Sequence, residues 1–163
     1  PDGRADIMKI ALIQQHALKD RDDNLKRGIA AFHEAARAGA QLVAYAELGF
    51  LPFLPQVPAG PDAHSWAESI PGPTTEVLGE LAGELGVVIV ASLFERRAAG
   101  LYHNTAVVID ADGSLAGVTR MLHITEYPCF HEQGYYTPGD RGAPVFDTAA
   151  LHARAAADFA LSD

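Results

Sequence analysis

Apolar positions along the chain follow two different spacings. Short continuous apolar runs, which are typical of buried strands, lie at 8–14, 41–46, 87–93 and 102–109. In two other stretches, apolar residues recur every three or four positions and a glycine follows, as in an amphipathic helix that ends at a glycine. These predicted helices span 22–38 and 74–85, and Thr74 could cap the second. The Pro- and Gly-rich stretch 51–73 predicts a surface loop, with a short helix near 63–68.

The last predicted strand continues into a hairpin. Residues 110–113 have the composition of a turn, and 114–124 could pair with the strand before it. The order β, α, β, loop, α, β, β, β predicts an α/β fold with a mostly parallel or mixed sheet covered by helices. The tail 149–163 is dominated by alanine and lacks β-branched residues, so it favours helix or does not belong to the same fold.

Size and charge limit the functional classes. The 163 residues suit one domain, and 12 Lys plus Arg against 21 Asp plus Glu give a net charge of −9, which disfavours nucleic acid and anionic membranes as partners. The single cysteine, Cys129, excludes an intrachain disulfide and suits a reducing compartment. Residues 1–6 are polar, unlike a signal peptide, and no apolar run approaches a membrane span. We therefore predict a cytoplasmic chain.

Two groups of residues could carry chemistry. Glu47 directly follows an apolar strand, and functional groups gather at the carboxyl ends of strands in open α/β sheets, although a surface or helix-capping glutamate fits equally well. The second group consists of residue types that can bind metal ions, but their spacing is not that of a known metal site. They are therefore predicted to be hydrogen-bonded structural residues, and no metal is predicted. The group comprises His103, His123, Glu126, Cys129, His131 and Glu132. No glycine-rich phosphate loop follows the first strand, so no nucleotide cofactor is predicted.

Four segments, in this order, carry a resemblance to a known family. They read MKIALIQ at 8–14, NLKRGIAAFHEAARAGAQLVAYAEL at 24–48, YHNTAVVIDADGSLAG at 102–117 and FHEQGYYTPGD at 130–140. The set resembles the carbon–nitrogen hydrolase, or nitrilase, superfamily over 8–148, and within it the amidases that act on N-carbamoyl amines and aliphatic amides. The resemblance implies half of a four-layer α-β-β-α sandwich, a mixed sheet with helices on one face. The bare apolar face then predicts self-association as a homo-oligomer, aggregation, or a fold that a partner chain completes.

The resemblance also implies a mechanism with a glutamate, a lysine and a cysteine. A carboxylate helps to generate a thiolate, the thiolate attacks an amide, carbamoyl or nitrile carbon, and a cation stabilises the developing charge. Glu47 matches the glutamate base, and Glu132 matches a second glutamate that supports the site. A loop salt bridge is the alternative role for Glu132.

Two positions depart from the family pattern. Met121, which follows Arg120, occupies the lysine position and carries no charge. The nucleophilic cysteine should follow Phe146–Thr148, where this chain has the alanine-rich tail 149–163, and Cys129 does not match that position. We therefore predict a frameshift or early stop and an inactive chain. The alternative is a non-catalytic remnant or an assembly or binding subunit of the same fold.

Overall fold

The computed structural model describes residues 8–140. Its elements alternate as the sequence predicts up to the fifth strand, and short elements follow. In chain order they are β1 (Ile10–Ile13), α1 (Arg21–Arg37), β2 (Leu42–Tyr45), η1 (Leu54–Gln56), α2 (Pro73–Leu85), β3 (Val88–Ala98), β4 (Leu101–Ile109), β5 (Leu115–Arg120), β6 (Glu126–Tyr127), β7 (Phe130–His131) and η2 (Glu132–Gly134). The predictions for 146–148 and for the tail 149–163 lie outside the described residues.

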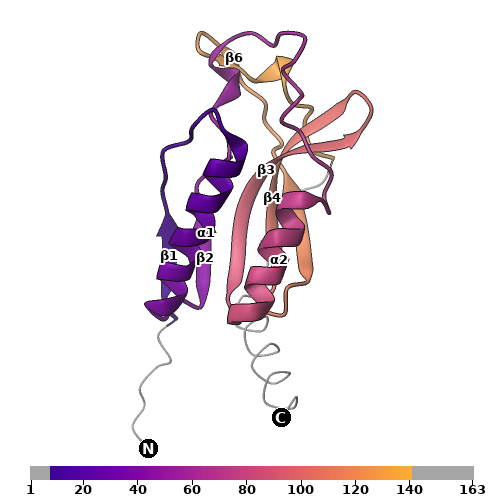
Figure 1. The fold of residues 1–163 in the computed structure, drawn as a ribbon. Coiled ribbons are helices and arrows are strands. Elements are labelled where there is room, and N and C mark those ends of the chain that lie inside the picture. Colours follow the sequence, from indigo (N-terminus) through magenta and orange to yellow (C-terminus); the bar gives the residue numbers. More distant parts are fainter. Residues whose placement is uncertain (1–7, 141–163) are drawn as a thin grey trace, which may run out of the picture.

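The first five strands form one mixed sheet in the order β1-β2-β3-β4-β5. β1, β2 and β3 are parallel, and β4 and β5 continue the sheet as antiparallel neighbours. Both described helices, α1 and α2, lie on the same face of the sheet (Figure 1). The prediction of an α/β fold with a mixed sheet and helices on one face is confirmed.

The helix-covered face holds the main core. Alternate strand positions point to this face, where Val43, Ile89 and Val107 are almost fully buried against Phe32 of α1 and Leu78 of α2. Burying side chains of this size contributes about 1.5–3 kcal/mol each. The two helices that follow β1 and β2 therefore bury this face of the sheet.

The intervening strand positions form the opposite face. Ile10 pairs with Leu42, and Leu12 pairs with Ala44 in the next row, so these apolar side chains point away from the helices. At the β1 edge this face is open, since Leu12 is 81% exposed and Ile10 is 54% exposed.

The helix ends follow from local chemistry. Asp20 caps α1 by accepting a hydrogen bond from the Asp23 amide, and α2 begins at Pro73 with Gly72 and Thr75 exchanging cap bonds. Thr74 is therefore not the cap as predicted; its amide donates instead to the Glu68 carboxylate, at 3.0 Å. The same carboxylate pairs with Arg21 at 2.7 Å, which joins the N-terminal ends of the two helices.

Other boundaries also differ from the predictions. Residues 61–66 form turns rather than a helix, and the 3-10 helix of this loop is η1 instead. β5 ends at Arg120, before the predicted 124, because the chain then turns into the β6–β7 hairpin. No described helix is both long and apolar enough to cross a membrane.

Candidate active site

Glu47 lies just beyond the carboxyl end of β2, as predicted. The strand ends at Tyr45, and the chain turns sharply, with a hydrogen bond of 3.0 Å from the Gly49 amide to the Ala46 carbonyl. Leu48 adopts a left-handed backbone conformation with φ 49°, which is uncommon for a non-glycine residue. The turn leaves Glu47 exposed at the carboxyl end of β2. β6 lies beyond the same end of the parallel strands (Figure 1). Glu47 does not cap a helix among the described residues.

Asn104 on β4 fixes one oxygen of the Glu47 carboxylate. Its Nδ2 donates to Glu47 Oε1 at 2.6 Å, and its Oδ1 accepts from Ser92 Oγ at 2.9 Å. Asn104 is 5% exposed, so β3 and β4 hold this amide rigidly. We did not predict this residue, because it lies between two other polar residues of β4, His103 and Thr105, and local sequence does not distinguish it from them.

Met121, the predicted lysine position, lies beside the same amide. Its Sδ is 3.8 Å from Asn104 Nδ2, and its backbone amide donates to the Asn104 carbonyl at 2.9 Å. The side chain packs with a cluster that contains Leu48, Phe94 and Tyr136. Position 121 thus reaches Glu47 through Asn104, but a thioether offers neither charge nor an N–H donor.

Glu132 enters the site from η2. It is 5% exposed, and its Oε2 accepts from the Thr125 amide at 3.0 Å and from Thr125 Oγ1 at 2.5 Å. The alternative of a loop salt bridge does not hold among the described residues, because no Lys, Arg or His pairs with Glu132.

Tyr136 is buried, and the charges of both glutamates act on its hydroxyl. Burial raises the pKa of its hydroxyl above the ordinary value, and the nearby Glu132 and Glu47 carboxylates raise it further. The ring packs edge-on against Phe94 with centroids 5.0 Å apart. Contacts thus link residues that the sequence separates by up to 85 positions: Asn104 contacts both Glu47 and Met121, Met121 packs in the same cluster as Tyr136, and the Tyr136 amide bonds the Glu132 carbonyl at 2.8 Å.

Cys129 and the histidines lie apart from this group. Cys129 is exposed at the turn between β6 and β7, with φ 67°, and makes no hydrogen bond to Glu47. His131 contacts Glu126 at 2.8 Å, and His103 Nδ1 contacts the Thr137 carbonyl at 2.8 Å, as structural histidines do. Between residues 8 and 140, no group of three or more His, Cys, Asp and Glu side chains is arranged to hold a metal ion.

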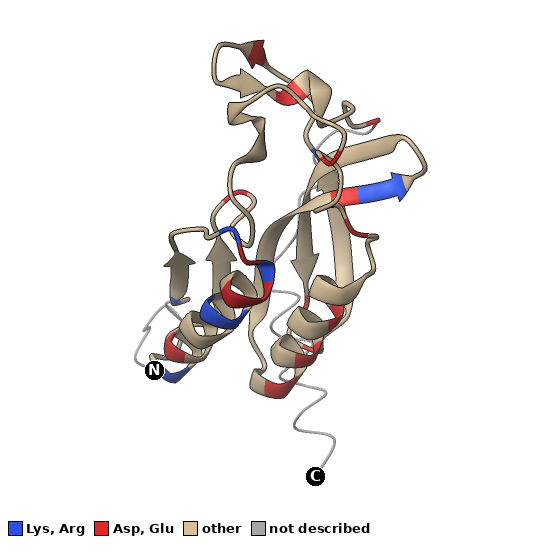
Figure 2. Cartoon of the chain, turned by 45° about the horizontal axis from the view of Figure 1, so that its top comes forward, with Lys and Arg blue, Asp and Glu red and all other residues tan. Residues whose placement is uncertain are grey.

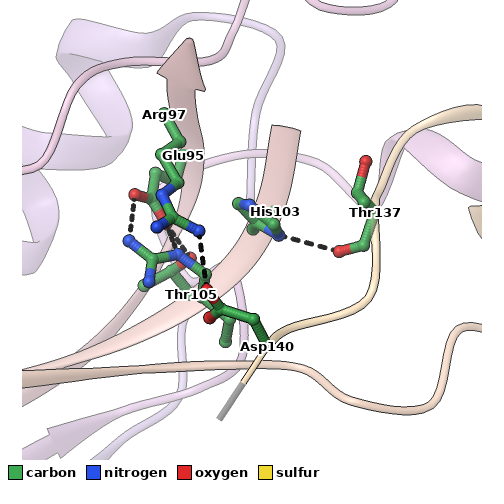
Figure 3. Close-up of polar contacts among 7 residues, drawn as sticks. Glu95, Arg97, His103, Thr105, Thr137 and Asp140 are labelled. Atoms are coloured by element: carbon green, nitrogen blue, oxygen red, sulfur yellow. Dashed lines mark hydrogen bonds and ion pairs between the residues drawn. The ribbon is translucent and has the colours of Figure 1, made fainter. Parts of the chain in front are cut away.

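A buried ion pair supports the strand that leads to Met121. Arg120 Nε and Nη2 donate to Glu95 at 2.7 and 2.6 Å, and Thr105 Oγ1 adds a third bond at 2.6 Å (Figure 3). Burial alone would raise the pKa of the Glu95 carboxyl, but the Arg120 and Thr105 hydrogen bonds outweigh it and hold the pKa below the ordinary value. Glu95 was not predicted, because nothing in the local sequence distinguishes it from a surface glutamate.

Charge is unevenly placed on the described surface. α2 carries Glu76, Glu80 and Glu84 and no Lys or Arg, whereas α1 carries both signs (Figure 2). An acidic helix of this kind repels polyanions.

Known proteins resemble this chain in sequence. The family of carbon-nitrogen hydrolases matches residues 9–157. N-carbamoylputrescine amidase from Solanum lycopersicum is 34% identical over 87% of this chain and 47% of its own length. Omega-amidase NIT2-A from Xenopus laevis is 32% identical over 86% of this chain and 50% of its own length.

A solved structure extends the likeness to three dimensions. The carbon-nitrogen hydrolase from Helicobacter pylori G27 superposes with a TM-score of 0.77 at 34% identity, covering 83% of this chain and 46% of that one. The chain spans about half the length of these relatives. Together the family match, the relatives and the shared fold show that this chain belongs to the carbon-nitrogen hydrolase family.

Proposed function

We propose that this chain supplies the carboxylate part of a thiol-dependent hydrolase site for small amide, carbamoyl or nitrile substrates. One observation carries the proposal: at the carboxyl end of the parallel strands the Asn104 amide binds the Glu47 carboxylate at 2.6 Å, beside Met121 at 3.8 Å. The relatives named for amidase activity support amides and N-carbamoyl amines as the substrate class. The single cysteine supports a cytoplasmic location.

Each residue has a role in this scheme. Glu47 takes the proton of the attacking thiol and later activates water. The hydrogen bond from Asn104 to Oε1 orients the carboxylate, and Oε2 makes no protein hydrogen bond within residues 8–140. Glu132 supports the site structurally, and its carboxylate is held in place by two hydrogen bonds from Thr125. Base chemistry needs an accessible carboxylate in a fixed orientation, and Glu47 has both properties.

The 163-residue polypeptide itself is proposed to lack turnover. Met121 cannot stabilise developing negative charge, and the thiol of Cys129 lies in an exposed hairpin turn. The same two facts favour the second candidate function, a binding or assembly subunit of this fold that performs no catalysis.

The first test is direct. We expect the purified polypeptide to release no ammonia above an enzyme-free blank from N-carbamoylputrescine or butyramide, in a coupled ammonia assay at high protein concentration. Glu47→Gln and Cys129→Ser serve as paired variants. Release that both variants abolish would contradict the inactive assignment and make Cys129 the nucleophile, whereas release that neither variant alters would come from a contaminant.

Self-association through the helix-free face is the second expectation. Leu12 and Ile10 expose apolar surface beside Ala44 and Val90 on that face, and removing such surface from water is favourable. We expect light scattering to show oligomers for the 163-residue polypeptide and a shift toward monomer for Leu12→Lys. The matched control is Leu18→Lys, another exposed leucine outside the sheet. Monodisperse monomer for the unaltered polypeptide contradicts this expectation.

A further inference from the structure

Two carboxylates of the site have no compensating cation within residues 8–140. Between residues 8 and 140, the ion pairs of the structure engage neither Glu47 nor Glu132. Glu132 is 5% exposed, and buried charges in proteins are normally paired, because desolvation of an isolated charge is costly. The hydrogen bonds from Asn104 and Thr125 come from neutral groups, so they leave the negative charge uncompensated.

A buried hydroxyl, that of Tyr136, also lacks a partner among the residues that the structure describes. Tyr136 is 4% exposed, and its Oη makes no hydrogen bond within the described part of the chain. Most buried polar side-chain atoms have at least one partner, so an unpaired hydroxyl points to a ligand or water. The Tyr136 amide donates to the Glu132 carbonyl at 2.8 Å, and the ring lies in the same cluster as Met121, which contacts the Asn104 amide that binds Glu47. The charges of both carboxylates also act on the hydroxyl.

The surroundings favour an organic cation over a metal ion. Two glutamates and a phenol fall short of a metal-ligand cluster, and no such cluster occurs in residues 8–140. All three groups accept hydrogen bonds, and an ammonium group has three N–H donors to offer. Met121 and the aromatic cluster around Phe94 and Tyr136 give an alkyl group an apolar surface to contact.

We propose that the carboxylates of Glu47 and Glu132 and the hydroxyl of Tyr136 bind a small primary alkylammonium ion, whose alkyl group lies against Met121. The inference uses the same carboxylates as the proposed hydrolase site but requires no turnover. If hydrolysis occurs at this site but the alkylammonium ion does not bind, only this inference is wrong. If the ion binds without hydrolysis, the inference still holds.

Methionine methyl groups provide the probe. The chain has two methionines, Met8 and Met121. A sample labelled at the methionine methyl carbons therefore gives one signal from the site, at Met121, and one reference signal from Met8, which packs in a different apolar cluster. Titration with ethylammonium chloride is expected to shift the Met121 signal saturably and leave Met8 in place. With three non-hydrogen atoms, this ligand has an affinity limit of about 1 mM or weaker. Tetramethylammonium, which has no N–H, and sodium chloride at equal ionic strength serve as controls.

Charge-neutral variants locate the binding groups. Glu47→Gln and Glu132→Gln are each expected to weaken ethylammonium binding at least about tenfold, since each removes one of the two charges that attract the ion. Glu76→Gln, which neutralises an exposed carboxylate on α2, is the matched control and should bind as the unaltered chain does. The Met8 signal reports whether each variant remains folded.

A melting experiment gives a second, independent measurement. Ethylammonium should raise the Tm of the unaltered chain and of Met121→Leu, but not of Met121→Lys, whose own ammonium group would occupy the acceptors. The inference is overturned if the Met121 signal does not move, or if it moves equally with tetramethylammonium. Equal binding by the unaltered chain and both glutamine variants overturns it as well.

Discussion

Lysine at position 121 is expected to increase hydrolysis by about 10²–10³-fold in a complete site, the usual effect of one charge-stabilising donor. The test is a chimera that joins residues 1–148 of this chain to the remaining C-terminal part of the Solanum lycopersicum N-carbamoylputrescine amidase, the relative at 34% identity. Ammonia release from N-carbamoylputrescine is compared between the chimera with Met121 and its Met121→Lys variant. The unaltered plant enzyme is the positive control.

The physical reason lies in the position of Met121. Its Sδ is 3.8 Å from the Asn104 amide that binds Glu47, so a lysine here would place an ammonium group among the site carboxylates and beside the reacting heteroatom. A thioether can supply no hydrogen bond to negative charge that develops there.

Matched variants separate charge from packing. Met121→Leu in the same chimera keeps the apolar volume and is expected to remain as slow as the chimera with Met121. Glu47→Gln in the Met121→Lys chimera should return the rate to background, because the general base is lost. Equal rates for the chimera and its Met121→Lys variant, both folded and in the same oligomeric state, contradict the assignment of this position. A rate that survives Glu47→Gln contradicts the assignment of the base.

The sequence predicted those features that local patterns determine. Apolar runs located β1 to β4, three- and four-residue spacing located both helices, and Glu47 was placed correctly at the end of β2. The short β6–β7 hairpin was missed, because two-residue strands are too short to show an alternating pattern. The prediction of a loop helix near 63–68 was wrong, since tertiary contacts determine the conformation of that segment. One of these contacts is the backbone β-bridge between Glu68 and Glu95.

Residues that act across the sheet could not be predicted in this way. Asn104 reaches Glu47 over 57 positions, and Arg120 reaches Glu95 over 25, so neither pairing leaves a signal in local composition. The register of β3 and β4 places Phe94 opposite Asn104. The next residue of β3, Glu95, accepts a hydrogen bond from Thr105, which lies diagonally across the two strands. Once such a register is known, polar residues inside apolar strands become recognisable as a network.

The same network links the fold to the site. Arg120 is the last residue of β5, and Met121 follows it, so the Glu95 ion pair determines where position 121 emerges. The Met121 amide then bonds the Asn104 carbonyl at 2.9 Å, which brings β5 and β4 together beside Glu47. Loss of the ion pair should therefore affect both the stability of the sheet and the geometry around Glu47.

Glu95→Gln is expected to lower the free energy of unfolding by about 3–5 kcal/mol, the usual cost of breaking a buried ion pair from one side. Glu95 is 2% exposed, and the substitution leaves the Arg120 guanidinium largely buried without a counter-charge. Urea unfolding followed by circular dichroism measures the loss. The control is Asp140→Asn, which breaks the exposed Arg97 pair and should leave the unfolding midpoint almost unchanged, because solvent screens such pairs (Figure 3).

The pH dependence of the same variant tests the cause. The pKa of Glu95 in the folded chain lies below its ordinary value of 4.5, so the ionised carboxylate stabilises the fold fully above that value. This contribution is lost as the pH falls from about 4.5 through the lowered folded pKa, and the stability difference between the unaltered chain and Glu95→Gln should shrink over that window. A difference that stays constant from neutral pH to below that window would mean that packing, and not the ionised pair with Arg120, carries the effect. Joint replacement by Glu95→Leu and Arg120→Met, which removes both charges, should recover much of the loss if the unpaired charge is its cause.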